Sequence, residues 1–127
     1  MSLVKQNGSI VGQKSYAFAL TIIKLYKNLS TEKREFILSK QVLRSGTSIG
    51  ANINEALAGE SKRDFIHKMS ISLKEARETA YWLNLLSDSG YIEKGEYTIL
   101  INNCNELMKI LSSIILTTKE KYLSKQL

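Results

Sequence analysis

The 127-residue sequence lacks proline altogether and contains a single cysteine, a single histidine and a single tryptophan. Because proline kinks or breaks a helix, its absence permits long uninterrupted helices. With Cys104 alone the chain cannot form an internal disulfide, which fits a reducing compartment. His67 lies three residues after Asp64, a spacing that di-iron bundles use twice, so one copy argues against a metal site. We expect no metal and no cofactor.

Long apolar runs are also absent. The N-terminal residues contain none that would serve as a signal peptide, and no segment approaches the roughly 20 apolar residues of a membrane span. We therefore expect a cytoplasmic protein without membrane association. Hydrophobic residues make up 43% and charged residues 24% of the chain, the balance of a globular domain. The length predicts one domain over residues 1–127, with residues 1–10 as a flexible N-terminus.

Apolar residues recur at steps of three and four along four stretches, which predicts four amphipathic helices. Strand signals are nearly absent, and the connections between the stretches are short. Short connections favour antiparallel neighbours, so we predict an all-α, antiparallel up-down four-helix bundle with a left-handed twist. The four stripes comprise Phe18, Ile22, Leu25 and Leu29; Leu38, Val42, Ser45, Ile49, Ile53 and Ala56; Ile66, Met69, Leu73, Ala76, Ala80 and Leu83; and Tyr97, Ile101, Cys104, Met108, Leu111, Ile115, Thr118 and Tyr122.

Capping residues predict where these helices begin and end. The first helix is expected over about residues 12–28, and the hydroxyl residues 30–31 are N-cap candidates for the second. The second helix is expected to end at Gly59 in the left-handed conformation. Ser61 and Asp64 resemble a capping box for the third helix, with aspartate in place of the usual glutamate.

Residues 44–56, RSGTSIGANINEA, are unusually rich in small residues for a helix. They match neither a phosphate-binding loop nor a dinucleotide fingerprint, and the apolar phase continues through them. We therefore predict a helix whose Gly46 and Gly50 allow close approach of another helix or a second subunit. Polar residues along one flank would contact a neighbouring helix, a second subunit or water: these are Ser48, Asn52 and Glu55.

Glu75 and Glu78 are the one carboxylate pair whose spacing suggests a catalytic role. Two carboxylates can perform acid–base work when burial raises one pKa. Three residues apart on a helix that also carries cations, such a pair is more often structural, here with Arg44 or Lys40 as partners. No nucleophile signature accompanies them. We expect no enzyme and no catalytic residues.

The net charge of +6 is concentrated in the first third of the chain. Residues 1–44 hold eight Lys and Arg against two Glu, whereas residues 45–127 hold ten basic and ten acidic residues. Such asymmetry is typical of a surface for an anionic partner, most simply nucleic acid, although a merely solubilising face has the same composition. The candidate nucleic-acid-binding residues are Lys24, Lys27, Lys33, Arg34, Lys40 and Arg44.

Two blocks resemble a known family. Residues 44–59 and 72–83 are similar to the central pattern of the four helix bundle protein family. That family includes proteins encoded within intervening sequences of bacterial 23S ribosomal RNA genes, sometimes labelled S23. The chain also resembles the accessory proteins of diversity-generating retroelements. The motif residues with an expected packing or interface role are Arg44, Ser48, Asn52, Glu55, Glu75 and Glu78.

The resemblance implies a bundle that assembles into a homo-oligomeric ring, commonly a pentamer, and a role in association with RNA or DNA. The leading hypothesis is therefore a non-enzymatic oligomer with a basic surface for nucleic acid. The alternative is an oligomeric scaffold that binds a partner protein, with the positive charge only solubilising. Salt dependence separates the two, because phosphate contacts weaken steeply as salt rises.

Overall fold

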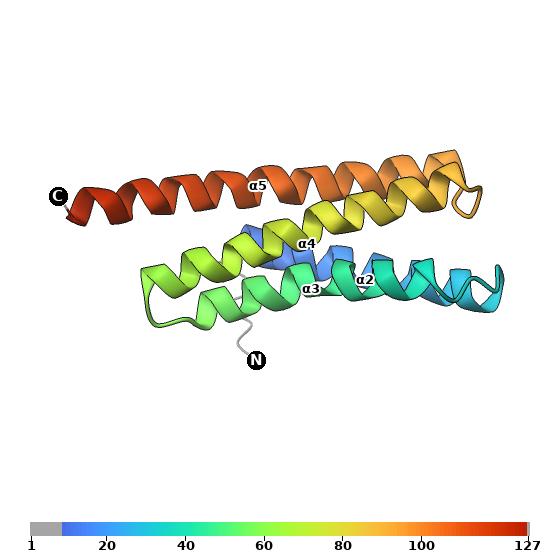
Figure 1. The fold of residues 1–127 in the computed structure, drawn as a ribbon, viewed down its shortest axis with the longest axis horizontal. Coiled ribbons are helices and arrows are strands. Elements are labelled where there is room, and N and C mark those ends of the chain that lie inside the picture. Colours follow the sequence, from blue (N-terminus) through green and yellow to red (C-terminus); the bar gives the residue numbers. More distant parts are fainter. Residues whose placement is uncertain (1–8, 127) are drawn as a thin grey trace.

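The computed structural model describes residues 9–126 and consists there of four helices. They are α2 (Ile10–Thr31), α3 (Leu38–Ala58), α4 (Lys62–Asp88) and α5 (Lys94–Gln126). Successive helices run antiparallel, with the α2–α3 and α4–α5 connections at one end and the α3–α4 connection at the other (Figure 1). The predicted all-α bundle is confirmed. The flexible segment expected over residues 1–10 lies outside the described residues except for Ser9, which caps α2, and Ile10, which begins it.

The boundary between the first two helices differs from the prediction. Ser30 and Thr31 belong to the last turn of α2, where their hydroxyls donate to the carbonyls of Tyr26 at 2.8 Å and Lys27 at 2.6 Å. They therefore do not cap α3, because a hydroxyl at a helix end bonds as readily to a preceding carbonyl. The start of α3 is capped by Glu35 instead, as described below.

The second junction corrects the role of a glycine. Gly59 has φ −67° and ψ 155°, an extended conformation rather than the predicted left-handed one. A Cβ at this position would lie 2.6 Å from Asp64 Oδ2 and 3.2 Å from the Ala56 carbonyl oxygen, so a larger residue here would displace the Asp64 side chain. The predicted cap is present in its first half, since Ser61 Oγ accepts the Asp64 N–H at 3.0 Å. The left-handed terminator occurs instead at Gly90 after α4, with φ 85°.

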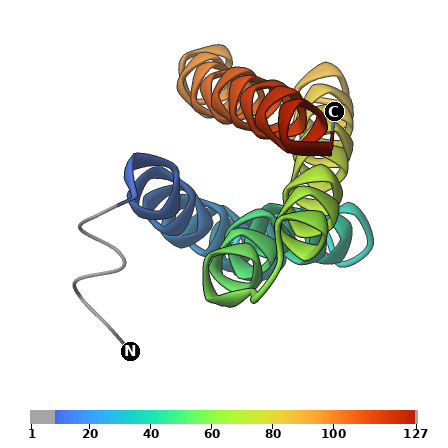
Figure 2. The same cartoon turned by 90° about the vertical axis from the view of Figure 1, so that its left-hand side faces the viewer.

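The core follows the predicted stripes. Ile22, Ile49, Leu83 and Leu111 are fully buried, one from each helix. Each helix packs mainly on its neighbours in sequence, and the contact between the first and last helices, α2 and α5, is slight. Viewed along the bundle, the helices form an arc that is open between α2 and α5 (Figure 2).

The α5 helix is more apolar than the sequence interpretation allowed. By length and composition its segment Lys94–Ser124 would be able to cross a membrane: the most apolar 18-residue window has a mean hydropathy of 1.3, and 28% of that window is buried. Core helices of soluble proteins pass the same test. Here Leu100, Cys104 and Leu107 of this helix lie in the bundle core, so α5 is a member of the fold.

Candidate nucleic-acid interface

The predicted basic residues gather at one end of the α2–α3 hairpin. A Cβ added at Gly46 or Gly50 would meet Ile22 or Ser15 respectively, so the C-terminal half of α2 lies beside the N-terminal half of α3. All the candidate side chains project from these halves or from the connection, residues 32–37, at the end seen on the right of Figure 1. They are exposed: Lys24, Lys27, Lys33, Arg34, Lys40 and Arg44.

The connection between α2 and α3 is held in one conformation by backbone hydrogen bonds. The Lys33 N–H donates to the Asn28 carbonyl at 3.2 Å, and the Glu35 N–H donates to the Leu29 carbonyl at 2.8 Å. Between them Arg34 has φ 53°, in the left-handed region that a residue with a side chain rarely adopts. Such strain persists only where surrounding contacts impose it, as these hydrogen bonds do.

Glu35 turns inward and caps α3. Its carboxylate accepts the N–H groups of Ile37, Leu38 and Ser39 at 3.2, 3.0 and 2.6 Å, and the residue is 9% exposed. Burial by itself would raise the pKa of this carboxyl, but the three backbone donors outweigh it and hold the pKa below its ordinary value. One of the two acidic residues in the first third is thus occupied with the backbone.

Phe36 and Ile37 follow Glu35 and are exposed, at 47% and 75%. The Arg34 guanidinium lies over the Phe36 ring, 5.6 Å from its centroid. Sequence reasoning missed this pair of apolar residues, although an aromatic residue beside two cations in a short connection was a readable signal. The end of the hairpin therefore combines positive charge with an exposed aromatic ring.

Arg44 differs from the other five cations because it is paired. Its guanidinium bonds Glu75 Oε1 at 3.3 Å and also contacts Glu78 Oε2, which in turn accepts the Trp82 indole N–H at 3.0 Å. This network joins α3 to α4 within one chain. Of the two partners that the sequence suggested for these carboxylates, Arg44 and Lys40, the structure pairs them with Arg44. With both carboxylates engaged by a cation, the arrangement is that of an interhelical ion pair rather than of an acid–base dyad.

The small-residue stretch is helical, as predicted, and its faces have different partners. Gly46 faces Ile22 of α2, whereas Ser45 Oγ accepts a hydrogen bond from Thr79 of α4 at 2.9 Å. The Ser48 hydroxyl and the Asn52 amide donate to carbonyls one turn earlier in α3 itself, at 2.6 and 2.8 Å. Glu55 is exposed. Close packing in this stretch is therefore accounted for within the monomer.

The remaining candidates for chemistry, Cys104 and His67, lie in opposite environments. Cys104 is fully buried, its thiol donates to the Ala76 carbonyl at 3.2 Å, and burial raises the pKa of the thiol to about 12. His67 is exposed on α4. Among residues 9–126 no three His, Cys, Asp or Glu side chains are grouped as metal ligands would be.

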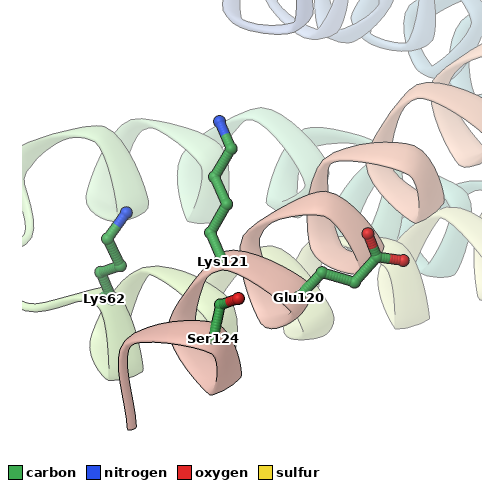
Figure 3. A pocket seen from close by; sticks show the side chains of 4 residues that line it. All are labelled: Lys62, Glu120, Lys121 and Ser124. Atoms are coloured by element: carbon green, nitrogen blue, oxygen red, sulfur yellow. The ribbon is translucent and has the colours of Figure 1, made fainter. Parts of the chain in front are cut away.

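Two surface hollows offer no catalytic arrangement. One, of about 370 Å³, lies between the start of α4 and the end of α5 and is lined by exposed Lys62, Glu120, Lys121 and Ser124 (Figure 3). The other, of about 230 Å³, lies between α2 and α5, where Lys14 and Glu106 form an ion pair at 3.3 Å. Exposed lysines and a surface ion pair are ordinary features of a solvated face.

Comparison with known proteins agrees with the architecture. The family model described as 23S rRNA-intervening sequence protein matches residues 8–113. A crystal structure described as a protein with unknown function from the S23 ribosomal protein family of Bacteroides thetaiotaomicron VPI-5482 is 53% identical, with a TM-score of 0.83. The match covers 84% of this chain and 98% of that one. No curated protein matches the chain.

Proposed function

Because the chain belongs to the family of 23S rRNA-intervening sequence proteins, we propose that it is a non-enzymatic, homo-oligomeric protein that binds RNA. The proposed contact surface is the basic end of the α2–α3 hairpin. One observation carries the proposal: five exposed cations within residues 24–40 lie at one end of the hairpin, and none has an ion-pair partner among the described residues. These are Lys24, Lys27, Lys33, Arg34 and Lys40.

Such a surface suits phosphate contacts rather than base reading. Lysine side chains are mobile point charges that neutralise phosphates without distinguishing sequence. Glu35 is buried and occupied with the start of α3, so it does not offset them at the surface. The affinity is therefore expected to fall steeply with salt, by a slope of about 0.7 per cation for single strands. The protein is proposed to work in the cytoplasm, where RNA and reduced thiols occur together.

Self-association is supported by exposed apolar side chains on α5. Ile99, Leu116 and Leu123 are each more than 60% exposed. We infer that further copies cover these side chains and that the copies close into a ring, with a pentamer favoured. A lipid bilayer is a poorer occupant, because insertion of α5 would break the Lys14–Glu106 pair and bury the glutamate.

The experiment combines solution mass with RNA affinity. Light scattering should give a multiple of the 14.3 kDa chain mass, and a monomer would contradict the assembly. Binding of a labelled single-stranded RNA is then measured across a salt series for the wild type and for a Lys33→Gln, Lys40→Gln variant. The variant should lose about 1.4 from the magnitude of the salt slope.

A matched control removes the same charge elsewhere. Lys62 and Lys121 lie at the opposite end of the bundle, beside the larger hollow (Figure 3). The Lys62→Gln, Lys121→Gln variant should retain the wild-type affinity and slope. Equal losses in both variants would mean that only net charge matters, and would refute a defined surface.

The alternative function is a scaffold for a partner protein, and one observation favours it. Tyr16 and Leu20 lie one turn apart on α2 and are 58% and 54% exposed, so they form a small uncovered apolar patch. A partner held by this patch would bind with little dependence on salt, and Leu20→Ser would weaken that binding. Under this alternative the wild-type protein would not bind the labelled RNA.

A further inference from the structure

The α2–α3 connection presents an aromatic ring on a rigid support. Glu35 faces the interior and accepts three backbone N–H groups, so its neighbours on either side, Arg34 and Phe36, face solvent. The hydrogen bond from the Glu35 N–H to Leu29, at 2.8 Å, holds Arg34 in its left-handed conformation. A left-handed residue just after a helix is a common way to end that helix, and here it fixes the direction in which the chain continues to Phe36.

The ring is partly covered by a cation and otherwise open. The Arg34 guanidinium lies 5.6 Å from the Phe36 centroid, while 47% of Phe36 remains accessible. An exposed aromatic side chain of this kind can accept a second planar group by stacking. Lys33, also exposed, lies in the same connection and can neutralise a phosphate of whatever strand brings that group.

We propose that Phe36 is a stacking residue for an unpaired RNA base, with Arg34 and Lys33 contacting the flanking phosphates. This inference rests on the proposed function and names its substrate class: single-stranded segments, loops or bulges rather than continuous duplex. Bases inside a duplex are already stacked and cannot reach a side chain on the surface, whereas unpaired bases can splay onto an aromatic ring.

Two exposed cations beside the ring, Lys33 and Arg34, against one exposed carboxylate, Glu32, argue for nucleic acid over an apolar partner. A protein surface that covered Phe36 and Ile37 would also desolvate the cations beside them, which costs free energy unless carboxylates are placed to match. A nucleotide supplies a planar apolar base and an anionic phosphate in one repeating unit. It therefore satisfies the ring and the cations together.

The test compares two RNAs and three substitutions at one position. The probes are a labelled 12-nucleotide single strand and the blunt duplex that it forms with its complement, at fixed salt and across a salt series. Phe36→Ala should weaken single-strand binding by about 5- to 150-fold, the equivalent of one lost base stack, and leave duplex affinity unchanged. The salt slope should stay that of the wild type, because no cation is removed.

The other substitutions separate stacking from apolar bulk. Phe36→Trp should retain single-strand affinity, whereas Phe36→Leu should lose it like alanine because leucine has no π face. Ile37→Ala is the neighbouring control and should bind normally. Because the ring is half exposed, circular dichroism should show these variants folded as the wild type is.

The outcomes separate the inference from the function beneath it. Three results would each overturn the stacking role while leaving RNA binding intact. They are an unchanged single-strand affinity in Phe36→Ala, an equal loss of affinity for both RNAs in Phe36→Ala, and a retained single-strand affinity in Phe36→Leu. A wild-type protein that binds neither RNA would refute the proposed function, and the stacking role with it.

Discussion

Replacing Gly46 with alanine should destabilise the protein, although alanine is the better helix former. A Cβ at Gly46 would lie 2.8 Å from Ile22 Cγ2 and 2.9 Å from Ile22 Cγ1. These atoms cannot rotate away independently, since both are attached to Cβ of a β-branched side chain that is fully buried. One of the two helices must therefore shift.

The magnitude follows from two opposing effects. Inserting one methyl group into a well-packed core costs about 1–3 kcal/mol. Replacing glycine with alanine inside a helix gains about 0.5–1 kcal/mol. The net loss in the free energy of unfolding should be about 0.5–2 kcal/mol. At Gly50 the added Cβ would lie 3.3 Å from Ser15 Oγ, so Gly50→Ala should stay within about 0.5 kcal/mol of the wild type.

The assay is urea unfolding followed by circular dichroism at one protein concentration, since assembly makes stability concentration-dependent. Second-site variants identify the clashing atoms. In an Ile22→Ala background both γ carbons are gone, so Gly46→Ala should be neutral or stabilising. In Ile22→Val both remain, and the full loss should persist. A stabilising Gly46→Ala in the wild type, or an equal loss in all backgrounds, would refute this account of the close approach.

Three further predictions concern side chains whose environments differ sharply. Glu35→Gln should lower the free energy of unfolding by about 1–2 kcal/mol at pH 7, measured by urea titration. The pKa of Glu35 is lowered on folding, so its contribution to the free energy of unfolding is present above the ordinary carboxyl value of 4.5 and is lost as pH falls through the folded value. The unfolding free energies of the two proteins should therefore converge in acid. A difference that stays constant with pH would contradict the cap. Cys104, whose thiol pKa is raised to about 12, should resist a thiol reagent at pH 8 until urea unfolds the chain, and rapid native labelling would show that the core opens. Arg44→Ala should lower the free energy of unfolding by about 1 kcal/mol or less, and by less still in high salt, because the arginine side chain is 49% exposed. Trp82 fluorescence should report the change around Glu78. A large loss that does not depend on salt would mean that the network is far better shielded than this exposure suggests.

Helix existence was predictable because it depends on local periodicity, whereas helix ends were predictable only in part, as at the Ser61 cap of α4. The hydroxyls of Ser30 and Thr31 bond backward to α2 rather than forward to α3, and both choices use the same residue types. Glu35 caps α3 from a position three residues before Leu38, where the sequence showed only a charged residue. Gly59 is extended although the residue type favoured the left-handed conformation, because glycine permits both.

The candidate interface was predictable in part. Charge counting located the basic third of the chain, and the hairpin then brought those cations to one end. Phe36 was missed although its position beside two cations was readable, because only the structure shows that its ring is exposed and lies under the Arg34 guanidinium. For the carboxylates of Glu75 and Glu78 the sequence offered Arg44 or Lys40 as partners, and the choice of Arg44 depends on how α3 packs on α4.

The amino-acid sequence by itself determined four amphipathic helices, their antiparallel order and the concentration of positive charge in the first third. Each of these depends on spacing along a single segment or on simple counting. Only the tertiary structure decided that Gly46 rather than Gly50 lies tightest against α2, that Arg44 is paired while Lys40 is exposed, and that α2 and α5 leave one side open. These features depend on distances between segments far apart in the chain, and such distances are set by how whole helix faces pack.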